Sequence, residues 1–270
     1  MITAERLAWG IFLNSIVAIL AWKRRGVTIS GALAGFTSGV FILVVGGWIQ
    51  WLLLMTFFVS SMLAGRYKRS LKQKAESMHS KGYRRDAVQV LANAGPSMLF
   101  ILLSLLHGDK MLTIAAAGFA AATADTWAGE LGMLSKKAPV SILTGKPVAK
   151  GTSGGVSPLG FAFSFSGSLL IALVYTLATG LSRGFSATSL VQLLVISLGG
   201  FIGSVIDSLL GASVQAKYRC SQTGEMTEKA RSGHLSNQLV SGAALMTNDL
   251  VNFLATAGSA SLGMLLLRLL

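Results

Sequence analysis

Residues 111–134 read MLTIAAAGFAAATADTWAGELGML. This stretch is long enough to cross the hydrocarbon core of a bilayer as a helix, which needs about 20 mostly apolar residues. It nevertheless carries two carboxylates, Asp125 and Glu130, with no basic residue in the same segment. A charge at the centre of a membrane helix costs about 2.5–3.5 kcal/mol on insertion scales, so acids in such a stretch indicate a functional site.

The rest of the chain shares this apolar character. Of its 270 residues, 52% are hydrophobic and 12% are charged, and the mean hydropathy is +0.64. A soluble domain carries roughly 25% charged residues, which excludes a water-soluble enzyme. Cys220 is the one cysteine, so the sequence excludes an intramolecular disulfide framework and any CxxC metal or redox site.

Eight apolar windows are long enough to span a bilayer. They cover residues 2–22, 27–45, 48–64, 88–106, 111–134, 159–181, 189–213 and 239–268. We predict an all-α, polytopic membrane helix bundle of about eight transmembrane helices, with residues 1–270 forming a single integral membrane domain. The last window is too long for one untilted span and Gly258 could divide it, so seven to nine crossings remain open.

The basic residues predict the orientation. Nineteen of the 23 Lys and Arg residues fall in the loops after the first, third, fifth and seventh windows. Because Lys and Arg accumulate in cytoplasmic loops, both termini are expected outside and loops 65–87, 135–158 and 214–238 inside. This predicts a multi-pass protein of the bacterial or organellar inner membrane type. The net charge of +13 then reflects topology, so the expected partner is the lipid bilayer rather than nucleic acid; the sequence leaves the oligomeric state open.

Four acids lie within or at the edge of these windows: Asp125, Glu130, Asp207 and Asp249. At 1.5 Å per residue, all four fall in the predicted cytoplasmic half of the membrane. They must face a wet cavity, be protonated, pair with loop lysines or bind cations. We predict that they converge on one inward-facing site. Asp125 and Glu130 are about 140° apart on an ideal helix, so sharing a site predicts that the helix bends or unwinds at Gly129.

Polar side chains near these acids extend the candidate site. Gln89 and Asn93 form a polar stripe that enters the fourth window, and Asn248 and Asn252 form an oxygen-rich face beside Asp249. We expect these four side chains to line the site, although hydrogen bonds between helices are an alternative role. Asp207 lies in a stripe of glycines at every fourth position, which predicts close approach of another helix.

The loop TGKPVAKGTSGGVS (residues 144–157) is a candidate phosphate site. Glycines expose backbone N–H groups, lysines add positive charge and hydroxyls add donors, which together suit a phosphate cradle. The loop does not match the Walker A pattern, and a flexible interhelical connection is the alternative interpretation. The candidate nucleotide- and phosphate-binding residues are Lys146, Lys150, Gly151, Thr152, Ser153 and Gly154.

The combined residue types favour phosphoryl transfer. Carboxylate oxygens are ligands for Mg²⁺, which is commonly held by one or two carboxylates together with substrate phosphates. The acids and amides near the predicted cytoplasmic side offer oxygen ligands of this kind. Phosphoryl transfer also needs cationic side chains that neutralise the phosphate oxygens. A membrane-embedded site of this kind predicts a metal-dependent enzyme that acts on a lipid phosphate or alcohol.

Five ordered motifs add a resemblance. They are RDAVQVLAN (85–93), ADTWAGELG (124–132), KGTSGGVS (150–157), GSVIDSLLGA (203–212) and NDLVN (248–252). Over about residues 27–265, the chain resembles the integral membrane family that includes plant phytyl-phosphate kinase and animal transmembrane protein 19. It departs from the family pattern at Ala124, Gly129 and Ser153, where we expect Gly, Ser and, in the plant enzyme, an acidic residue.

The resemblance implies a Mg²⁺-dependent kinase that uses a nucleoside triphosphate, plausibly CTP, to convert an isoprenyl (phytyl or polyprenyl) monophosphate to the diphosphate. In this interpretation Asp125, Glu130, Asp207 and Asp249 are the catalytic acids, acting as ligands of Mg²⁺ or nucleotide. Asp125, Asp207 and Asp249 are then the candidate metal ligands, and Lys150, Gly151 and Thr152 contact phosphate. The departures leave the nucleotide and the acceptor open. Two alternatives stand beside the kinase: a transporter or translocase of lipid phosphates or other anions, and a noncatalytic membrane scaffold.

Overall fold

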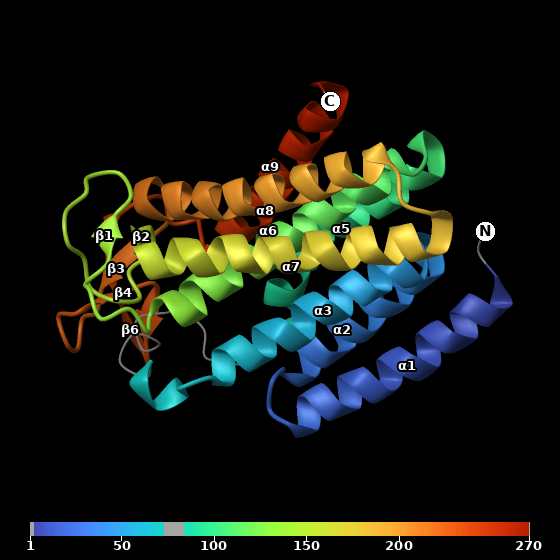
Figure 1. The fold of residues 1–270 in the computed structure, drawn as a ribbon. Coiled ribbons are helices and arrows are strands. Elements are labelled where there is room, and N and C mark those ends of the chain that lie inside the picture. The colour runs from blue at the N-terminus through green and yellow to red at the C-terminus, as the bar shows by residue number, and fades with distance from the viewer. Residues whose placement is uncertain (1–2, 73–83, 270) are drawn as a thin grey trace.

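The computed structural model describes residues 3–72 and 84–269. These residues form one helix bundle, with the short strands gathered at one end (Figure 1). The described helices are α1 (Ala4–Lys23), α2 (Ile29–Phe41), α3 (Gly47–Arg66), α5 (Ala87–His107), α6 (Lys110–Gly132), α7 (Pro158–Arg183), α8 (Ala187–Ser213) and α9 (Asn248–Leu269). The bundle of about eight membrane helices is therefore confirmed. We call the end with the strands the loop end, and the other the opposite end.

Helices α2 and α3 form a hairpin, although composition alone makes residues 29–66 one long apolar candidate span. Between them lie the π-helical turn η1 (Ile42–Gly46) and Gly47, whose φ of 79° reverses the chain. Both helices reach the loop end, because the Thr28 N–H donates to the Arg85 carbonyl at 3.0 Å and Arg66 donates to the Arg24 carbonyl at 3.0 Å. The separate windows 27–45 and 48–64 are thus correct.

The last predicted window, 239–268, began too early. Strand β7 (Gln238–Ser241) occupies its start, and α9 begins at Asn248, where the Thr247 hydroxyl accepts the Leu250 N–H at 3.3 Å. An apolar run such as Leu239-Val240 favours a strand as readily as a helix. Helix α9 continues unbroken through Gly258, so this glycine does not divide it.

The connections at the loop end contain short antiparallel sheets. Strand β1 (Val140–Ser141) pairs with β2 (Gly155–Val156), and β5 (Arg231–Ser232) pairs with β6 (Leu235–Ser236). A third sheet has the order β4-β3-β7, with β3 at Lys217–Arg219 and β4 at Met226–Thr227. The predicted loop 65–87 contains the short helix η2 (Arg69–Leu71), and its residues 73–83 lie outside the described residues.

Helix α6 runs through the centre of the bundle and packs against α3, α5, α7, α8 and α9. Its middle is rich in alanine, and these small side chains are buried because neighbouring helices approach closely. A Cβ added to Gly203 of α8 would lie 2.6 Å from the Ala121 Cβ and 2.7 Å from the Ser259 Cβ. Gly199 and Gly203 of the glycine stripe therefore face α6 and α9, as predicted, whereas Gly211 faces Gly154 of the loop.

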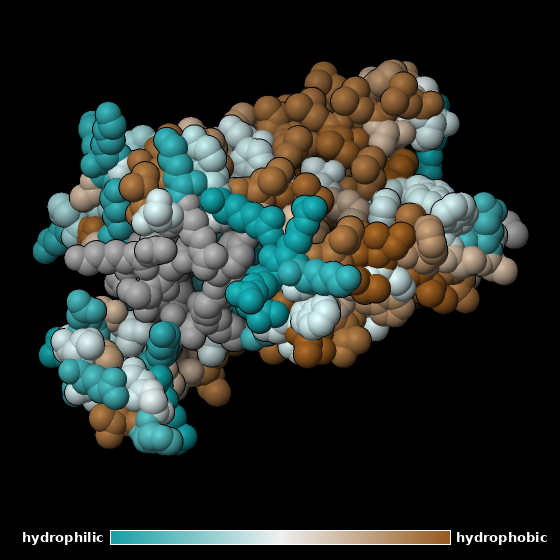
Figure 2. All heavy atoms as spheres, turned by 90° about the horizontal axis from the view of Figure 1, so that it is seen from below, coloured by the Kyte–Doolittle hydropathy of each residue, from teal (hydrophilic) through white to brown (hydrophobic). Residues whose placement is uncertain are grey.

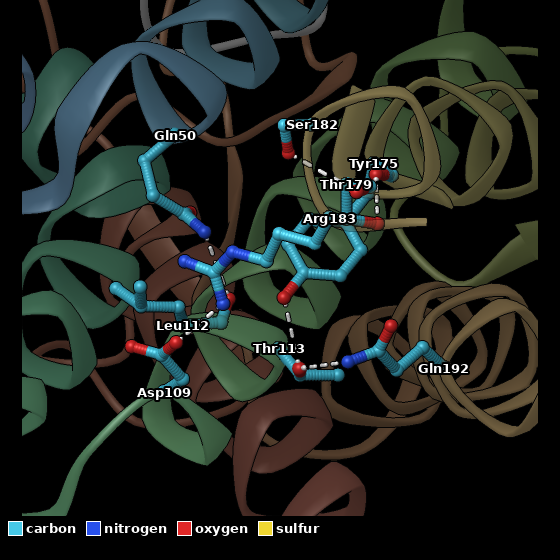
Figure 3. A network of polar contacts seen from close by, with 9 residues as sticks. All are labelled: Gln50, Asp109, Leu112, Thr113, Tyr175, Thr179, Ser182, Arg183 and Gln192. Carbon is cyan, nitrogen blue, oxygen red and sulfur yellow. Dashed lines mark hydrogen bonds and ion pairs between the residues drawn. The ribbon is translucent and has the colours of Figure 1, made fainter. Parts of the chain in front are cut away.

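A polar network joins four helices near the opposite end (Figure 3). The Thr113 hydroxyl of α6 lies 2.9 Å from the Tyr175 hydroxyl of α7 and accepts from the Gln192 amide of α8 at 3.3 Å. Gln50 of α3 donates to the Leu112 carbonyl at 3.0 Å. Such bonds replace water at groups that a helix bundle buries, so they hold these helices together at this end.

The outer faces of the helices are apolar. Leu33, Leu106 and Leu181 have exposed fractions of 62%, 80% and 82%, which in a membrane bundle marks contact with lipid. Figure 2 shows hydrophobic residues over the half of one face that is away from the strands, and hydrophilic residues over the loop end. The lipid bilayer is therefore a partner of this chain.

Candidate functional site

A cavity of about 300 Å³ opens at the loop end, among α5, α6, α7, α8 and α9. The segment 150–157 forms a further part of its wall. The structure brings thirteen of the fourteen predicted site residues to this one cavity. They are Asp125, Glu130, Asp207, Asp249, Lys150, Gly151, Thr152, Ser153, Gly154, Gln89, Asn93, Asn248 and Asn252.

Two of the acids that line the cavity are in contact with each other. The Asp207 side chain of α8 is hydrogen-bonded to that of Asp125 on α6, and the Glu228 carboxylate is near enough to interact with it electrostatically. With its amide oriented to satisfy its neighbours, Asn252 donates to Asp207 Oδ2 at 2.9 Å and to the Asn248 carbonyl at 3.3 Å. Two carboxylates this close favour a shared proton or a bound cation.

Glu130 is held differently from the other acids. Its Oε2 lies 2.6 Å from Nζ of Lys72, whose side chain is fully buried and also donates to the Ala64 and Gly65 carbonyls at 2.9 and 3.0 Å. Helix α6 is continuous through Gly129, so the chain does not unwind there. No bend is needed, because Glu130 lies at the edge of the cavity and turns toward Lys72.

Three helices begin at the cavity, and their first turns line it. Gln89 and Asn93 of α5, Gly160 and Ser164 of α7 and Asn248, Asp249 and Asn252 of α9 contribute to the wall. The N-terminal end of a helix carries partial positive charge and unpaired N–H groups, so three such ends favour an anionic ligand. Asp125 and Asp207 come from the C-terminal halves of α6 and α8. Apart from Asp249 in the first turn of α9, helix direction thus separates anion-attracting from cation-attracting groups within one cavity.

Side chains from the segment that follows α8 hold the predicted phosphate loop in place. Ser153 contacts the Glu228 carboxylate and accepts from the Gln215 amide at 2.9 Å, and its carbonyl accepts from Lys217 Nζ at 3.1 Å. Burial lowers the pKa of the Lys217 ammonium, an effect that the nearby Glu228 carboxylate opposes. Gly151 and Gly154 have φ of 86° and 78°, which allow the loop to turn toward the cavity.

Lys146 is the predicted site residue that the structure does not place at the cavity. The Ser141 N–H donates to its carbonyl at 2.9 Å, within a turn that points this exposed lysine into solvent. Lys150 does line the cavity, and its Nζ donates to the Ser135 and Met133 carbonyls at 2.6 and 3.2 Å. These bonds hold Lys150 beside the end of α6.

Sequence reasoning missed two charged residues of the wall, Arg85 and Glu228. Arg85 precedes the Asp86 capping box of α5 and donates to Thr126 Oγ1 at 3.4 Å. Its position directly before the polar stripe of Gln89 and Asn93 was a usable signal. Glu228 lies in a connection between two-residue strands, and no periodic pattern marks it. Its neighbours Glu225 and Lys229 are exposed and do not line the cavity.

Known proteins resemble this chain over most of its length. The family described as "Integral membrane protein DUF92" matches residues 12–260, which is most of the chain. The chain belongs to this integral membrane family. No solved structure matches it.

Relatives of this DUF92 chain occur in plants, archaea and cyanobacteria. "Protein PGR" of Arabidopsis thaliana is 33% identical and covers 93% of this chain and 92% of its own length. An uncharacterized membrane protein of Methanocaldococcus jannaschii is 31% identical over 80% of this chain and 87% of its own. A membrane protein of Synechocystis is 26% identical over 77% of this chain and 80% of its own. The likeness extends over nearly the whole helix bundle.

The predicted phosphate loop of this DUF92 protein approaches α8 closely at Gly154. A Cβ on Gly154 would lie 2.4 Å from both the Cβ and the backbone nitrogen of Ala212 on α8, at a φ of 78°. We expect Gly154→Ala to lower the free energy of unfolding by about 2–3 kcal/mol, from left-handed strain plus overpacking. Thermal unfolding of the purified protein in detergent measures this change.

Gly145→Ala is the matched control. Gly145 has a similar φ of 67°, but an added Cβ would meet nothing within 4 Å. This substitution is expected to cost only the strain, about 1 kcal/mol. Equal losses in the two variants would show that the contact between the loop and α8 does not hold the loop in place.

Proposed function

We propose that this protein is a Mg²⁺-dependent membrane kinase that transfers the γ-phosphoryl group of CTP or ATP to an isoprenyl monophosphate, phytyl or polyprenyl, and forms the diphosphate. One observation carries the proposal: a single cavity at the end of a membrane bundle combines groups for anions and groups for cations. Three helix N-termini, Arg85 and Lys150 attract phosphates, and Asp125 and Asp207 attract a cation. Phosphoryl transfer depends on both kinds of group.

The carboxylate pair fits Mg²⁺. This ion prefers hard oxygen ligands and is usually bound by one or two carboxylates with waters and substrate phosphates. Asp125 and Asp207 supply two such groups close together. Among the described residues, no set of three or more His, Cys, Asp or Glu side chains is arranged to hold a metal. Phosphate and water oxygens would therefore complete the coordination, and the bound ion would supply charge neutralisation.

The proposed reaction breaks one bond and forms one. An oxygen of the acceptor phosphate bonds to the γ-phosphorus, while the bond from that phosphorus to the β-phosphate oxygen breaks and releases the nucleoside diphosphate. Near neutral pH the attacking oxygen is already anionic, because a phosphate monoester loses its second proton with a pKa of about 6. None of the four acids therefore has to act as a general base. In this proposal Arg85, Lys150 and the loop N–H groups orient phosphates and reduce their mutual repulsion.

The packing below the cavity favours the kinase over a translocase of lipid phosphates. Toward the opposite end, the interior of the bundle is filled by buried apolar side chains that include Ile114 and Phe119 of α6, Ile171 of α7 and Ile196 of α8. A phosphate that crossed the bundle there would leave water and lose its hydrogen bonds, which is costly. A site that receives its substrates and releases its products at the same end avoids this barrier.

The full chain in lipid nanodiscs tests the proposal. With Mg²⁺, γ-labelled CTP or ATP, and phytyl or polyprenyl monophosphate, labelled diphosphate is expected on thin-layer chromatography. Free phytol is the matched control, since it has the same hydrocarbon chain but no attacking phosphate oxygen, and it should yield no product. Absence of product with every nucleotide and acceptor would contradict the proposal. Nucleotide-independent movement of a lipid phosphate in proteoliposomes would support the translocase instead.

A further inference from the structure

A second cavity, of about 60 Å³, lies among α1, α2, α3 and α5. Its walls are almost entirely apolar, with Val17 and Ala18 from α1, Leu54 and Phe57 from α3, and Val90 from α5. On the α2 side they are made of small residues, which leaves the space open. These are Gly31, Ala32, Gly35 and Ser38.

Arg85 is the residue shared by the two cavities. Its guanidinium carbon lies 5.4 Å from the centre of the Phe57 ring, in the wall of the apolar cavity, and Nη2 donates to Thr126 on the side of the polar one. Its backbone is fixed by bonds with Gly26 and Thr28 at 3.2 and 3.0 Å. A cation between a polar and an apolar cavity matches a ligand with an anionic head and a hydrocarbon tail.

We propose that the apolar cavity binds the part of the acceptor's isoprenyl chain next to its phosphate, while Arg85 contacts the phosphate itself. This inference rests on the proposed function, because it assigns the acceptor's position in that site. From Gly31, beside the Arg85 carbonyl, to Ser38 the cavity follows α2 for about 10 Å, at 1.5 Å per residue. Apolar cavities of this kind stay dry, so a hydrocarbon chain enters without displacing ordered water.

Filling the cavity tests this inference. Gly35 lines the cavity and an added Cβ there would meet nothing within 4 Å, so Gly35→Leu directs a larger side chain into the cavity. Ala18→Leu fills it from the opposite wall on α1. Both variants are expected to raise the Kd for tritiated geranylgeranyl monophosphate, and its KM in turnover, about tenfold or more, which corresponds to two or more methylene groups left unburied. The KM for the nucleotide and the thermal midpoint should stay unchanged.

Leu33→Trp is the control, because it adds bulk to the exposed, lipid-facing side of the same helix. It should leave the Kd for geranylgeranyl monophosphate within about twofold of the wild-type value. If the wild type turns over the acceptor but Gly35→Leu and Ala18→Leu bind it with unchanged affinity, the kinase stands and the inference about the apolar cavity is overturned. If the wild type binds the acceptor without turnover, the kinase is rejected, and the Kd values of the variants still decide whether the isoprenyl chain lies in this cavity. Equal losses in Leu33→Trp, or a bilayer lipid that geranylgeranyl monophosphate does not displace from the cavity, would also overturn it.

Discussion

Asp207→Asn is expected to lower diphosphate formation by about a thousandfold or more, the scale seen when a charged group is removed from a phosphoryl-transfer site. Asp207 is hydrogen-bonded to Asp125 and is contacted by the Asn252 amide, so the asparagine keeps the size and much of the hydrogen bonding but removes the charge. Single-turnover measurements with saturating nucleotide and acceptor separate this loss from weaker binding.

The same substitution should not unfold the protein. Without Mg²⁺ the two acids are hydrogen-bonded through a shared proton, and an amide can donate a hydrogen bond in its place, so the thermal midpoint without Mg²⁺ is expected to stay level or rise. The stabilisation that Mg²⁺ gives the wild type should disappear, because ligand binding raises stability only where the ligand still binds. Wild-type turnover in Asp207→Asn, or an unchanged Mg²⁺-induced shift, would remove this carboxylate from the proposed site.

Asp109→Asn provides the control for charge removal. Asp109 precedes the start of α6 at the opposite end and pairs with Arg183 on the surface, with both side chains more than 60% exposed. Exposed pairs of this kind contribute little to stability, about 0–1 kcal/mol. This variant should retain activity, so the effect of Asp207→Asn can be assigned to the cavity rather than to loss of any acid on a helix.

Most of the helices could be predicted from the sequence because membrane spans follow composition and length. The boundaries of α5 and α8 fall within two residues of their predicted windows. The prediction failed at residues 239–247, where pairing of β7 with β3 outweighed the apolar composition. Pairing between segments distant in sequence is decided by tertiary contacts, which a local window does not record.

The site residues that lie within the apolar helices could be predicted from the sequence. Asp125, Asp207 and Asn93 were conspicuous because polar groups inside apolar helices need a common wet cavity. In a polar connection between strands a charged residue is not unusual, so nothing in the sequence marked Glu228 as a site residue. Lys146 was placed at the site only because its loop is rich in glycine and lysine. The turn that contains it is closed by the bond from the Ser141 N–H to the Lys146 carbonyl and by the bridge between Val140 and Pro147.

The second large effect is expected at the Lys72–Glu130 pair. Glu130→Gln should lower the free energy of unfolding by about 3–5 kcal/mol, because it leaves the fully buried Lys72 ammonium without its counter-charge. Lys72→Met should cost less, since the Glu130 side chain is 26% exposed and keeps contact with water. Denaturant unfolding in mixed micelles measures both changes.

The double variant Lys72→Met/Glu130→Met separates a structural role of Glu130 from a chemical one. Replacing both partners of a buried pair with apolar side chains is often nearly neutral, so the double variant should recover most of the stability that Glu130→Gln loses. If Glu130 serves mainly to fix the segment after α3 against α6, turnover should then stay within about tenfold of the wild type, since Asp125 and Asp207 keep their places. A folded double variant as inactive as Asp207→Asn would instead assign Glu130 to the reaction itself. The Glu130 carboxylate would then act on the bound Mg²⁺ or the nucleotide and not only on Lys72.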